Sequence, residues 1–311
     1  MKFLLIVFVV LTTALVGLFV WTSMQVLRIE ENYPPTGRFA ELENGRLHYA
    51  DVGKGSGAPI LFVHGASGNL LDQQFAYQDA LRDSARMLFV DRPGYGYSER
   101  AGADTPAKQA EQYRELLDTL EIDKVVVVGH SLGTASVAAF AVLYPERVQG
   151  LVFVAPATHP WPGGVTWYYE VSATPVIGTL FTETLVIPTA QGSMDVAANS
   201  VFKPQKAPEN YVENTSVPLV LRPSTFRHNA SDVAGLNAFV REFSPRYREI
   251  KAPTVVITGD KDDIVAPDIH SLGLQRDIEG AELIVLPGIG HKPDYSATDV
   301  VVKAIKKVSA R

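Results

Sequence analysis

The chain has 311 residues, 46% of them hydrophobic, so it can bury a full core as one large domain or one domain with an insertion. Its formal charge is −6 and it has no basic run, which argues against a nucleic-acid partner. It contains no cysteine, which excludes disulfides, thiolate metal sites and a cysteine nucleophile. We expect neither a metal nor a cofactor in its function.

The first 27 residues form a separate segment. Residues 3–27 carry no charge, and roughly 20 apolar residues are enough to cross the core of a bilayer. A cleavable secretory signal is the alternative, but its apolar region is typically about 7–15 residues long and is followed by a small-x-small cleavage site. The uncharged stretch is longer here, and residues 21–25 contain no convincing cleavage pattern. We therefore interpret residues 1–27 as a transmembrane anchor.

The charges that flank this segment predict its orientation. Lys2 lies on one side, and Arg28 lies on the other beside two glutamates. This bias predicts a cytoplasmic N-terminus and places the bulk of the chain outside the cytoplasm. Without Lys2 and Arg28, 26 basic and 34 acidic residues remain, a net charge of −8. Charge would not draw such a domain to anionic lipid, so we expect the membrane contact to come from the helix.

Beyond a linker at residues 32–37, strand-like runs alternate with helix-like segments. An antiparallel edge strand is expected at 47–52, and buried strands are expected at 59–63, 87–90, 125–128, 151–154, 254–257 and 283–286. Helices are expected over 106–120 and 267–278. Strands that alternate with helices predict a mostly parallel sheet covered on both faces. Ligands of such sheets bind at the carboxyl ends of the strands.

Residues 129–133, Gly-His-Ser-Leu-Gly, join an apolar strand to a helix. A serine between glycines at such a turn is forced into a sharp bend that raises its hydroxyl above the sheet edge. The N-terminus of the following helix offers unpaired N–H groups where an oxyanion would form. Glycine and serine are common, so the pentapeptide alone is a weak signal. Ser131 as a nucleophile requires partners elsewhere in the chain.

A second glycine-flanked loop, residues 64–69, follows the strand at 59–63. It allows the N–H of Ala66 to point into the space above Ser131 and to form a two-donor oxyanion hole with the N–H of Leu132. The alternative is a simple tight loop. We expect His64 to be structural. The turn at residues 91–98, rich in glycine and proline, is interpreted as architectural and without a catalytic role.

The partners of the serine should follow it in the order acid, then histidine. Residues 259–267 follow a buried strand and contain three carboxylates, and residues 287–291 end in His291 after the last strand. His291 would take the proton from Ser131, and an aspartate would hold the histidine tautomer and stabilise the imidazolium. The alternative for each carboxylate is a solvated turn or a helix cap. The residues alone leave the acid open among Asp260, Asp262 and Asp263.

Over residues 46–307 the chain resembles the α/β-hydrolase superfamily, in the branch with HG-x-x-G, D-R-P-G-x-G-x-S, G-x-S-x-G, G-x-x-D and G-H motifs in this order. The resemblance implies an eight-stranded, mostly parallel sheet flanked by helices. It also implies that Asp262, three residues after Gly259, is the acid. Some members carry the acid after the preceding strand, but residues 154–158 contain no carboxylate. Thr134 stands where many members have a second glycine, which predicts a slightly wider contact between helix and strand.

The resemblance divides the chain into four parts. Residues 28–157 and 252–311 form the hydrolase core after the anchor at 1–27, and residues 158–251 form a helical cap, or lid. Serine in place of aspartate argues against the epoxide hydrolases and haloalkane dehalogenases of this branch and favours an acyl-enzyme route.

We predict a serine esterase whose small-molecule substrate carries an acyl group. The aromatic residues of the cap and the membrane anchor together favour a lipid-like ester. Carbon–carbon bond, thioester and lactone hydrolysis are alternatives on the same triad. A non-catalytic scaffold is disfavoured, because no member of the triad is lost.

Overall fold

The computed structural model describes residues 1–310 and is built around one eight-stranded sheet. The strand order is β1-β2-β4-β3-β5-β6-β7-β8, with β1, β2 and β4 paired antiparallel and all other neighbours parallel. The strands are β1 (Arg38–Leu42), β2 (Gly45–Val52), β3 (Gly57–Val63), β4 (Ala85–Val90), β5 (Val125–His130), β6 (Val148–Val154), β7 (Thr254–Gly259) and β8 (Glu282–Leu286). The predicted eight-stranded, mostly parallel sheet is confirmed.

One detail of the strand prediction is wrong. Residues 47–52 lie in an antiparallel strand, but β2 is second in the sheet, because β1 pairs with its outer side. β1 is only five residues long, carries two charges, and buries Ala40 alone, so its sequence has no strong strand pattern. Its charges are typical of an exposed edge.

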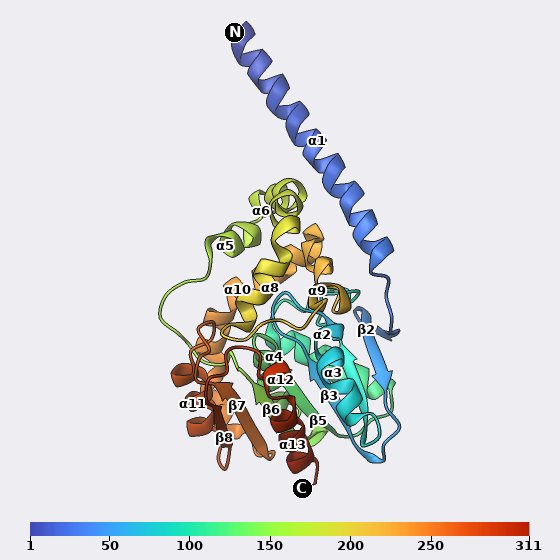
Figure 1. Cartoon of the computed structure of the whole chain (residues 1–311), viewed down its shortest axis with the longest axis vertical. Helices are drawn as coiled ribbons and strands as arrows, with labels where there is room; N and C mark the ends of the chain where they lie inside the picture. Colours follow the sequence, from blue (N-terminus) through green and yellow to red (C-terminus); the bar gives the residue numbers. More distant parts are fainter. Residues whose placement is uncertain (311) are drawn as a thin grey trace.

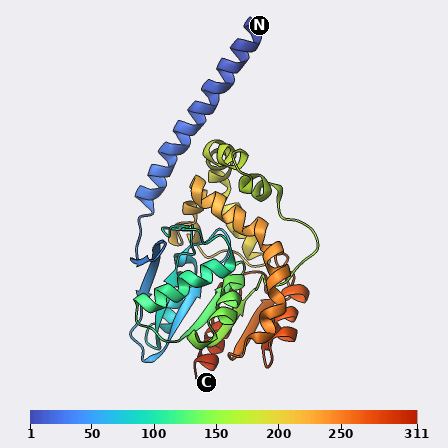
Figure 2. The ribbon, with the colours of Figure 1, turned by 180° about the vertical axis from the view of Figure 1, so that it is seen from behind.

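Helices cover both faces of the sheet, as Figures 1 and 2 show. On one face lie α3 (Pro106–Thr119), α4 (Gly133–Leu143) and α11 (Pro267–Asp277), and on the other lie α2 (Leu70–Leu81) and α13 (Thr298–Ser309). Successive strand residues point to opposite faces. Leu61 accordingly packs in the first core and Phe62 in the second. The helices predicted over residues 106–120 and 267–278 match α3 and α11 to within one residue at each end.

The chain between β6 and β7 contains helices, turns and loops and no strand. We call residues 158–251 the inserted segment; it lies over the carboxyl ends of the parallel strands (Figure 1). Its main elements are α5 (Trp167–Ala173), α6 (Ile177–Phe181), the π-helical turn η2 (Thr182–Val186), α7 (Ile187–Ala190), α8 (Met194–Phe202), α9 (Tyr211–Asn214), η4 (Val217–Leu221), α10 (Pro223–Phe243) and η5 (Ser244–Glu249). Short turns η1 (Pro145–Arg147) and η3 (Gln191–Ser193) and helix α12 (Pro293–Ser296) complete the fold.

The N-terminal helix α1 (Lys2–Asn32) projects away from the rest of the molecule (Figures 1 and 2). Its most apolar stretch has a mean hydropathy of 2.9 and no buried residue, so by length and composition it could cross a membrane. Its C-terminal part packs against the inserted segment, where Ile29 joins a small apolar cluster. The end of α1 is held by Tyr97, whose hydroxyl donates to the carbonyl of Tyr33 at 2.5 Å.

Candidate active site

The turn between β5 and α4 holds Ser131 in an unusual backbone conformation. Its φ is +49°, in the left-handed region that few residues other than glycine adopt. A Cβ on Gly133 would lie 2.3 Å from the carbonyl oxygen of His64, and one on Gly129 would lie 2.8 Å from Cγ2 of Val137. The glycines therefore let the turn pack closely against β3 and α4, which supports the bend expected from the sequence.

Three loops at the carboxyl ends of β5, β7 and β8 bring Ser131, Asp262 and His291 together. His291 Nε2 lies 2.9 Å from Ser131 Oγ, and His291 Nδ1 lies 2.7 Å from Asp262 Oδ2. The second oxygen, Asp262 Oδ1, accepts from the amides of Ile264 and Val265 at 3.0 and 2.9 Å. The exposed fractions of the three site residues are 8% or less. The protein therefore largely excludes water from this chain of hydrogen bonds.

The other two carboxylates of the loop after β7 point elsewhere. Asp260 and Asp263 are both exposed. Asp260 Oδ1 accepts from the amide of Gly288 at 2.7 Å, so it fixes the turn that leads to His291. Of the three acids that the residues alone left open, the structure brings Asp262 to the histidine.

The two amides expected to bind an oxyanion lie at the ends of β3 and β5. Within residues 1–310, no hydrogen bond uses the N–H of Ala66 or of Leu132. Leu132 immediately precedes α4, and Gly65 beside Ala66 is so close to Ser131 that a Cβ on Gly65 would lie 3.0 Å from Cβ of Ser131. The loop is fixed from above, because the amide of Ser67 donates to Oδ1 of Asn229 in α10 at 2.8 Å.

His64 uses both ring nitrogens within the framework. Nδ1 donates to the carbonyl of Gly65 at 2.8 Å, and Nε2 accepts from the amide of Arg92 at 3.0 Å. Burial lowers the pKa of His64 to about 4, so the ring is neutral near pH 7. His64 thus braces the loop of Ala66 against the turn at 91–98, which fits the structural roles expected for both.

Thr134 contributes to the same turn. Its hydroxyl donates to the carbonyl of Ser131 and accepts from the amide of Ala157 at 2.9 Å. A Cβ on Gly129 would lie 3.2 Å from Cα of Thr134, so the helix and the strand meet closely at this point. The threonine therefore ties the start of α4 to the chain after β6.

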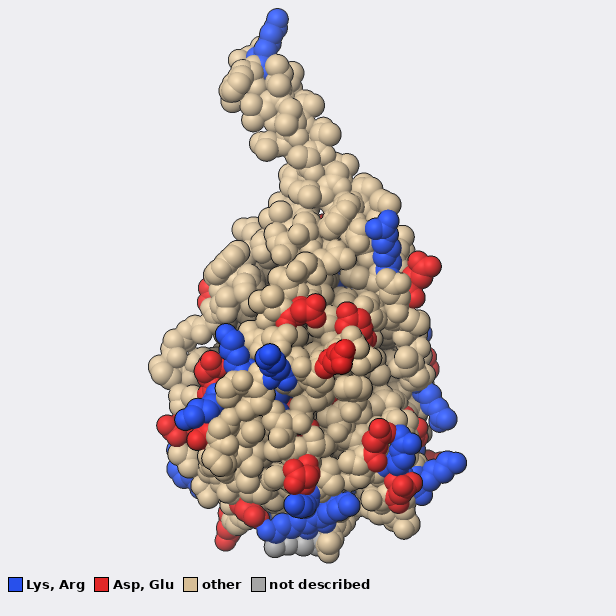
Figure 3. Space-filling view, viewed as in Figure 1, with Lys and Arg blue, Asp and Glu red and all other residues tan. Residues whose placement is uncertain are grey.

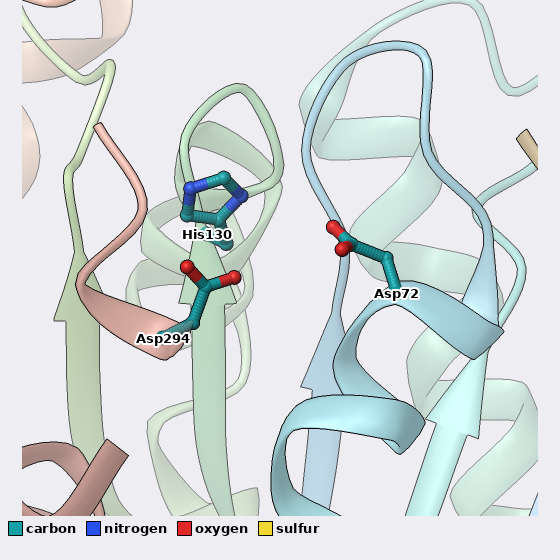
Figure 4. Close-up of side chains that lie close together, drawn as sticks. All are labelled: Asp72, His130 and Asp294. Atoms are coloured by element: carbon teal, nitrogen blue, oxygen red, sulfur yellow. The ribbon is translucent and has the colours of Figure 1, made fainter. Parts of the chain in front are cut away.

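A buried polar cluster behind the site was not predicted from the sequence. Figure 4 shows Asp72, His130 and Asp294 turned toward a common space, from α2, from the end of β5 and from α12. Lys292 Nζ lies 3.0 Å from Asp72 Oδ2 and 2.9 Å from Asp294 Oδ2. His130 Nε2 donates to the carbonyl of His291 at 3.1 Å. We call Asp72, His130, Lys292 and Asp294 the buried ionic cluster.

Charge compensation explains the protonation of the buried ionic cluster. Burial alone would lower the pKa of Lys292, but the carboxylates of Asp294 and Asp72 outweigh it and hold that pKa above its usual range. Burial would raise the pKa of Asp72, yet Lys292 lowers it to about 2. Burial, with Lys292 and His291, holds the pKa of His130 well below its usual range, so this ring is neutral.

Potential ligand atoms of Asp72, His130 and Asp294 lie within 4.8 Å of one another, a spacing that could hold a metal ion. The ammonium of Lys292 already lies beside both carboxylates and supplies the positive charge. We therefore assign the buried ionic cluster a structural role. It holds the segment that carries His291 against α2.

The free energy of unfolding is expected to fall as the pH drops from about 6.5 to about 4. His64 and His270 are neutral in the folded chain, because burial lowers the pKa of each to about 4. In this range the unfolded chain binds protons that the folded chain does not. Each histidine therefore lowers the free energy of unfolding by up to about 1.4 kcal/mol for each pH unit. Urea unfolding at pH values of about 7, 6 and 5 would measure this decrease.

One carboxyl acts in the opposite direction. Burial raises the pKa of Asp294 to about 6, so the folded chain takes up this proton first and gains stability as the pH falls. The stability gained from Asp294 offsets the stability lost from one histidine. The loss still dominates, because burial also lowers the pKa of His130, His159 and His228. A free energy of unfolding that stays constant or rises between pH values of about 6.5 and 4 would contradict this prediction.

Comparison with known proteins agrees with the fold. A family model described as "alpha/beta hydrolase fold" matches residues 58–293. The chain is 26% identical to Lipase 1 of Psychrobacter immobilis over 297 residues, which cover 93% of this chain and 89% of that protein. It is 28% identical to the 2-hydroxy-6-oxo-6-phenylhexa-2,4-dienoate hydrolase of Burkholderia cepacia over 278 residues, 83% of this chain and 89% of that protein.

Among solved structures, the enol-lactonase from Burkholderia xenovorans LB400 superposes with a TM-score of 0.68 at 21% identity. The match covers 88% of this chain and 100% of that chain, which at this identity is evidence for the fold alone. The family model spans most of the chain and the site lies on the strand ends that this fold uses. The protein is a hydrolase that belongs to the α/β-hydrolase family.

Proposed function

We propose that the chain hydrolyses carboxylic esters through an acyl-enzyme intermediate, with Ser131 as nucleophile, His291 as general base and Asp262 as orienting acid. The observation that carries the proposal is the pair of consecutive hydrogen bonds, 2.9 Å from Ser131 Oγ to His291 Nε2 and 2.7 Å from His291 Nδ1 to Asp262 Oδ2. Such a pair places a base within reach of the nucleophile and fixes the tautomer of that base.

In the acylation step, Ser131 Oγ attacks the ester carbonyl carbon while its proton passes to His291 Nε2. The carbonyl oxygen becomes an oxyanion that accepts from the amides of Ala66 and Leu132, neither of which is used within residues 1–310. Asp262 stabilises the imidazolium. His291 then gives its proton to the alkoxide as the carbon–oxygen bond breaks, and the alcohol leaves.

In the deacylation step, water takes the place of the alcohol. His291 Nε2 accepts a proton from the water as its oxygen attacks the acyl carbon, and the same amides bind the second oxyanion. Collapse of this intermediate releases the acid, and His291 returns the proton to Ser131 Oγ. One ester and one water thus yield one acid and one alcohol.

An apolar wall beside the nucleophile supports an acyl group as the ligand. Leu132 and Ala135 of the core cluster with Leu236 and Val240 of α10, and Ala66 and Trp161 pack against them. The exposed fraction of Ser131 is only 8%, so access to its hydroxyl is restricted. We propose that residues 158–251 act as the lid of this site and that the acyl chain lies against the wall.

Covalent labelling and an ester panel test this function. A fluorophosphonate should label the folded chain on Ser131, and p-nitrophenyl esters of graded acyl length should be hydrolysed, with medium or long chains preferred over acetate. No adduct, or an adduct that survives in Ser131→Ala, would refute the nucleophile. Preference for acetate would refute the apolar acyl site.

Carbon–carbon bond hydrolysis is the second candidate. It is favoured by the likeness to the B. cepacia hydrolase, which is named for a 2-hydroxy-6-oxo-dienoate substrate. Turnover of a vinylogous diketone without turnover of p-nitrophenyl esters would reverse the ranking. Thioesters and lactones can enter the same acyl-enzyme route, so both belong in the panel.

We also propose that α1 anchors the chain in a membrane, with a cytoplasmic N-terminus and an extracytoplasmic catalytic domain. The free apolar length of α1 and the basic Lys2 at its outer end support this arrangement. The full chain should remain in the membrane fraction after a high-salt wash, and protease added to intact cells with a permeable outer envelope should digest the domain. Release as a shortened soluble chain would identify α1 as a signal sequence.

Gly290→Ala is expected to lower kcat by about 10- to 100-fold, since a displacement of about 1 Å at a catalytic group has such an effect. A Cβ at Gly290 would lie 1.8 Å from the carbonyl oxygen of Lys203, and backbone atoms cannot yield cheaply. The amide of Gly290 also donates to Oε1 of Gln205 at 3.1 Å. The substitution would therefore displace the loop of His291 from the inserted segment.

Ester turnover of the purified variant measures this effect. Gly192→Ala is a matched control, because a Cβ there meets nothing within 4 Å and should leave turnover unchanged. If both variants were as active as the parent chain, the inserted segment would have no part in positioning His291.

A further inference from the structure

The inserted segment and α1 are packed together at a defined height along the helix. The face of α1 that loses contact with solvent consists of Leu18, Thr22, Gln25, Val26 and Ile29, which repeat at helical spacing. This face lies against η2, α7 and η4, and Val186 and Ile187 join Ile29 in one apolar cluster. Glu30 forms an ion pair with Arg222 at 3.1 Å. The position of the inserted segment relative to α1 is thereby fixed.

The uncharged part of α1 determines how deep that contact lies. It runs over residues 3–27, and a bilayer core takes up roughly 20 residues of helix. Every window of that length within residues 3–27 contains both Leu18 and Thr22. Whatever the register of α1 in the bilayer, the part of the inserted segment beside these two residues therefore lies at the level of the membrane.

The surface that reaches this level is apolar and exposed. The exposed fractions are 81% for Val176, 61% for Ile177 and 53% for Leu180, all in or next to α6, and Trp167 is 64% exposed. Val176 also adopts a φ of +64°, which is costly for a β-branched residue. No charged residue occurs in residues 171–182. In water this surface has no favourable partner.

Charge and hydropathy favour lipid as that partner. The helices over residues 167–173 and 177–202, bent by 116° at the break between them, are together long and apolar enough to span a membrane. In Figure 3 the upper part of the inserted segment and the free part of α1 are one uncharged surface, and the charged side chains of this face gather lower down and at the outer end of α1. Figures 1 and 2 both place α6 beside α1.

We propose that the apolar tip of the inserted segment, Trp167 with residues 176–180, dips into the same bilayer leaflet from which α1 emerges. The lid then lies partly in lipid, and an amphiphilic ester can pass from the bilayer to Ser131 without crossing water. The inference rests on α1 lying in a bilayer, and the entry of esters rests also on the proposed function. The occupant of the surface is a phospholipid bilayer, with no need for anionic lipid.

Single cysteines test the position of the tip, because the natural chain contains none. Phe8→Cys in α1, Ile177→Cys in the tip and Lys261→Cys in the core would each carry an environment-sensitive fluorophore on the full chain in phosphatidylcholine vesicles. Lipids with a nitroxide on the acyl chain should quench the labels at positions 8 and 177 and leave the label at 261 unchanged. Quenching at position 8 without quenching at 177 would overturn the inference and leave the anchor standing.

Two further outcomes of the same experiment are distinct. No quenching at position 8 would refute the anchor, and the inference with it. A label at 177 that is shielded from an aqueous quencher but not reached by the lipid nitroxide would indicate that a second copy of the chain covers the tip, and would overturn the inference. All these readings are independent of hydrolysis, so they stand even if the proposed function fails.

A pair of variants tests the consequence for turnover. Ile177→Asp with Leu180→Asp should lower hydrolysis of a long-chain ester embedded in vesicles by at least about threefold, because charged side chains are costly in the hydrocarbon of a bilayer, and should leave a soluble short-chain ester unaffected. Val285→Asp is the matched control. Val285 is 51% exposed, as the residues of the tip are, but it belongs to strand β8 of the sheet and not to the inserted segment. Equal loss with both substrates, or no loss with either, would contradict entry from lipid.

Discussion

Ser131→Ala is expected to lower kcat for ester hydrolysis by roughly five to six orders of magnitude, the scale seen when the nucleophile of such a triad is removed. The variant lacks the hydroxyl that lies 2.9 Å from His291 Nε2, so the proposed base has no nucleophile to activate at that position. Binding of the ester should persist, since the amides of Ala66 and Leu132 and the apolar wall are untouched. Stopped assays with a p-nitrophenyl ester would measure the loss.

Ser136→Ala is the matched control for this variant. Ser136 is also a buried serine, and its hydroxyl donates to the carbonyl of Gly133 at 2.9 Å, one turn into α4. Its removal should cost about 1 kcal/mol of stability and leave turnover nearly intact. If Ser131→Ala kept more than about 1% of the parent kcat, or if Ser136→Ala were equally inactive, the proposed acyl-enzyme route would be wrong.

Lys292→Met is expected to reduce the free energy of unfolding by about 3–5 kcal/mol, the effect of removing one partner from a buried ion pair. The ammonium lies 3.0 Å from Asp72 Oδ2 and 2.9 Å from Asp294 Oδ2, and all three side chains are buried. Without it, two carboxyl groups remain in a site with no other cation of comparable position. Denaturant unfolding of the full chain in detergent micelles would measure the change.

The control is Lys303→Met, which removes an exposed ion pair to Asp299 at 3.3 Å and should change stability by less than about 1 kcal/mol. Adding Asp294→Leu to Lys292→Met should recover part of the loss, because it removes one of the two buried carboxyl groups that are left without a cation. A loss for Lys292→Met no larger than for Lys303→Met would show that the buried ionic cluster does not hold the fold together.

The residues that meet at the site were predictable because each belongs to a short motif at the end of a strand. The glycines at 129 and 133 predict the sharp turn at Ser131. Parallel strands place their carboxyl ends along one edge of the sheet, so the motifs that follow these strands meet there. The choice of Asp262 over Asp260 and Asp263 came from the family resemblance, and the structure gives its physical reason in the direction of the side chains.

The buried ionic cluster was not predictable in the same way. Asp72 and Lys292 lie 220 positions apart, and each looks in sequence like an ordinary residue of a polar helix start or loop. Only the packing of α2 against the segment after β8 turns them into buried partners. The position along α1 at which the inserted segment packs could not be predicted for the same reason. It depends on contacts between segments that are distant in the sequence and that show only an apolar pattern locally.

The hydrogen bond from Ser67 to Asn229 links access to reactivity. Asn229 lies in α10 of the inserted segment, and Ser67 directly follows Ala66, one of the two proposed oxyanion donors. A movement that lifts α10, as proposed for the lid, would break this bond and free the loop that carries Ala66. If α10 moves as the proposed lid requires, the open chain would admit an ester while its proposed oxyanion donors are loosely held, and the chemical step would wait until α10 returns. On this proposal, water that reaches Ser131 while the ester is being loaded would meet an incompletely assembled site.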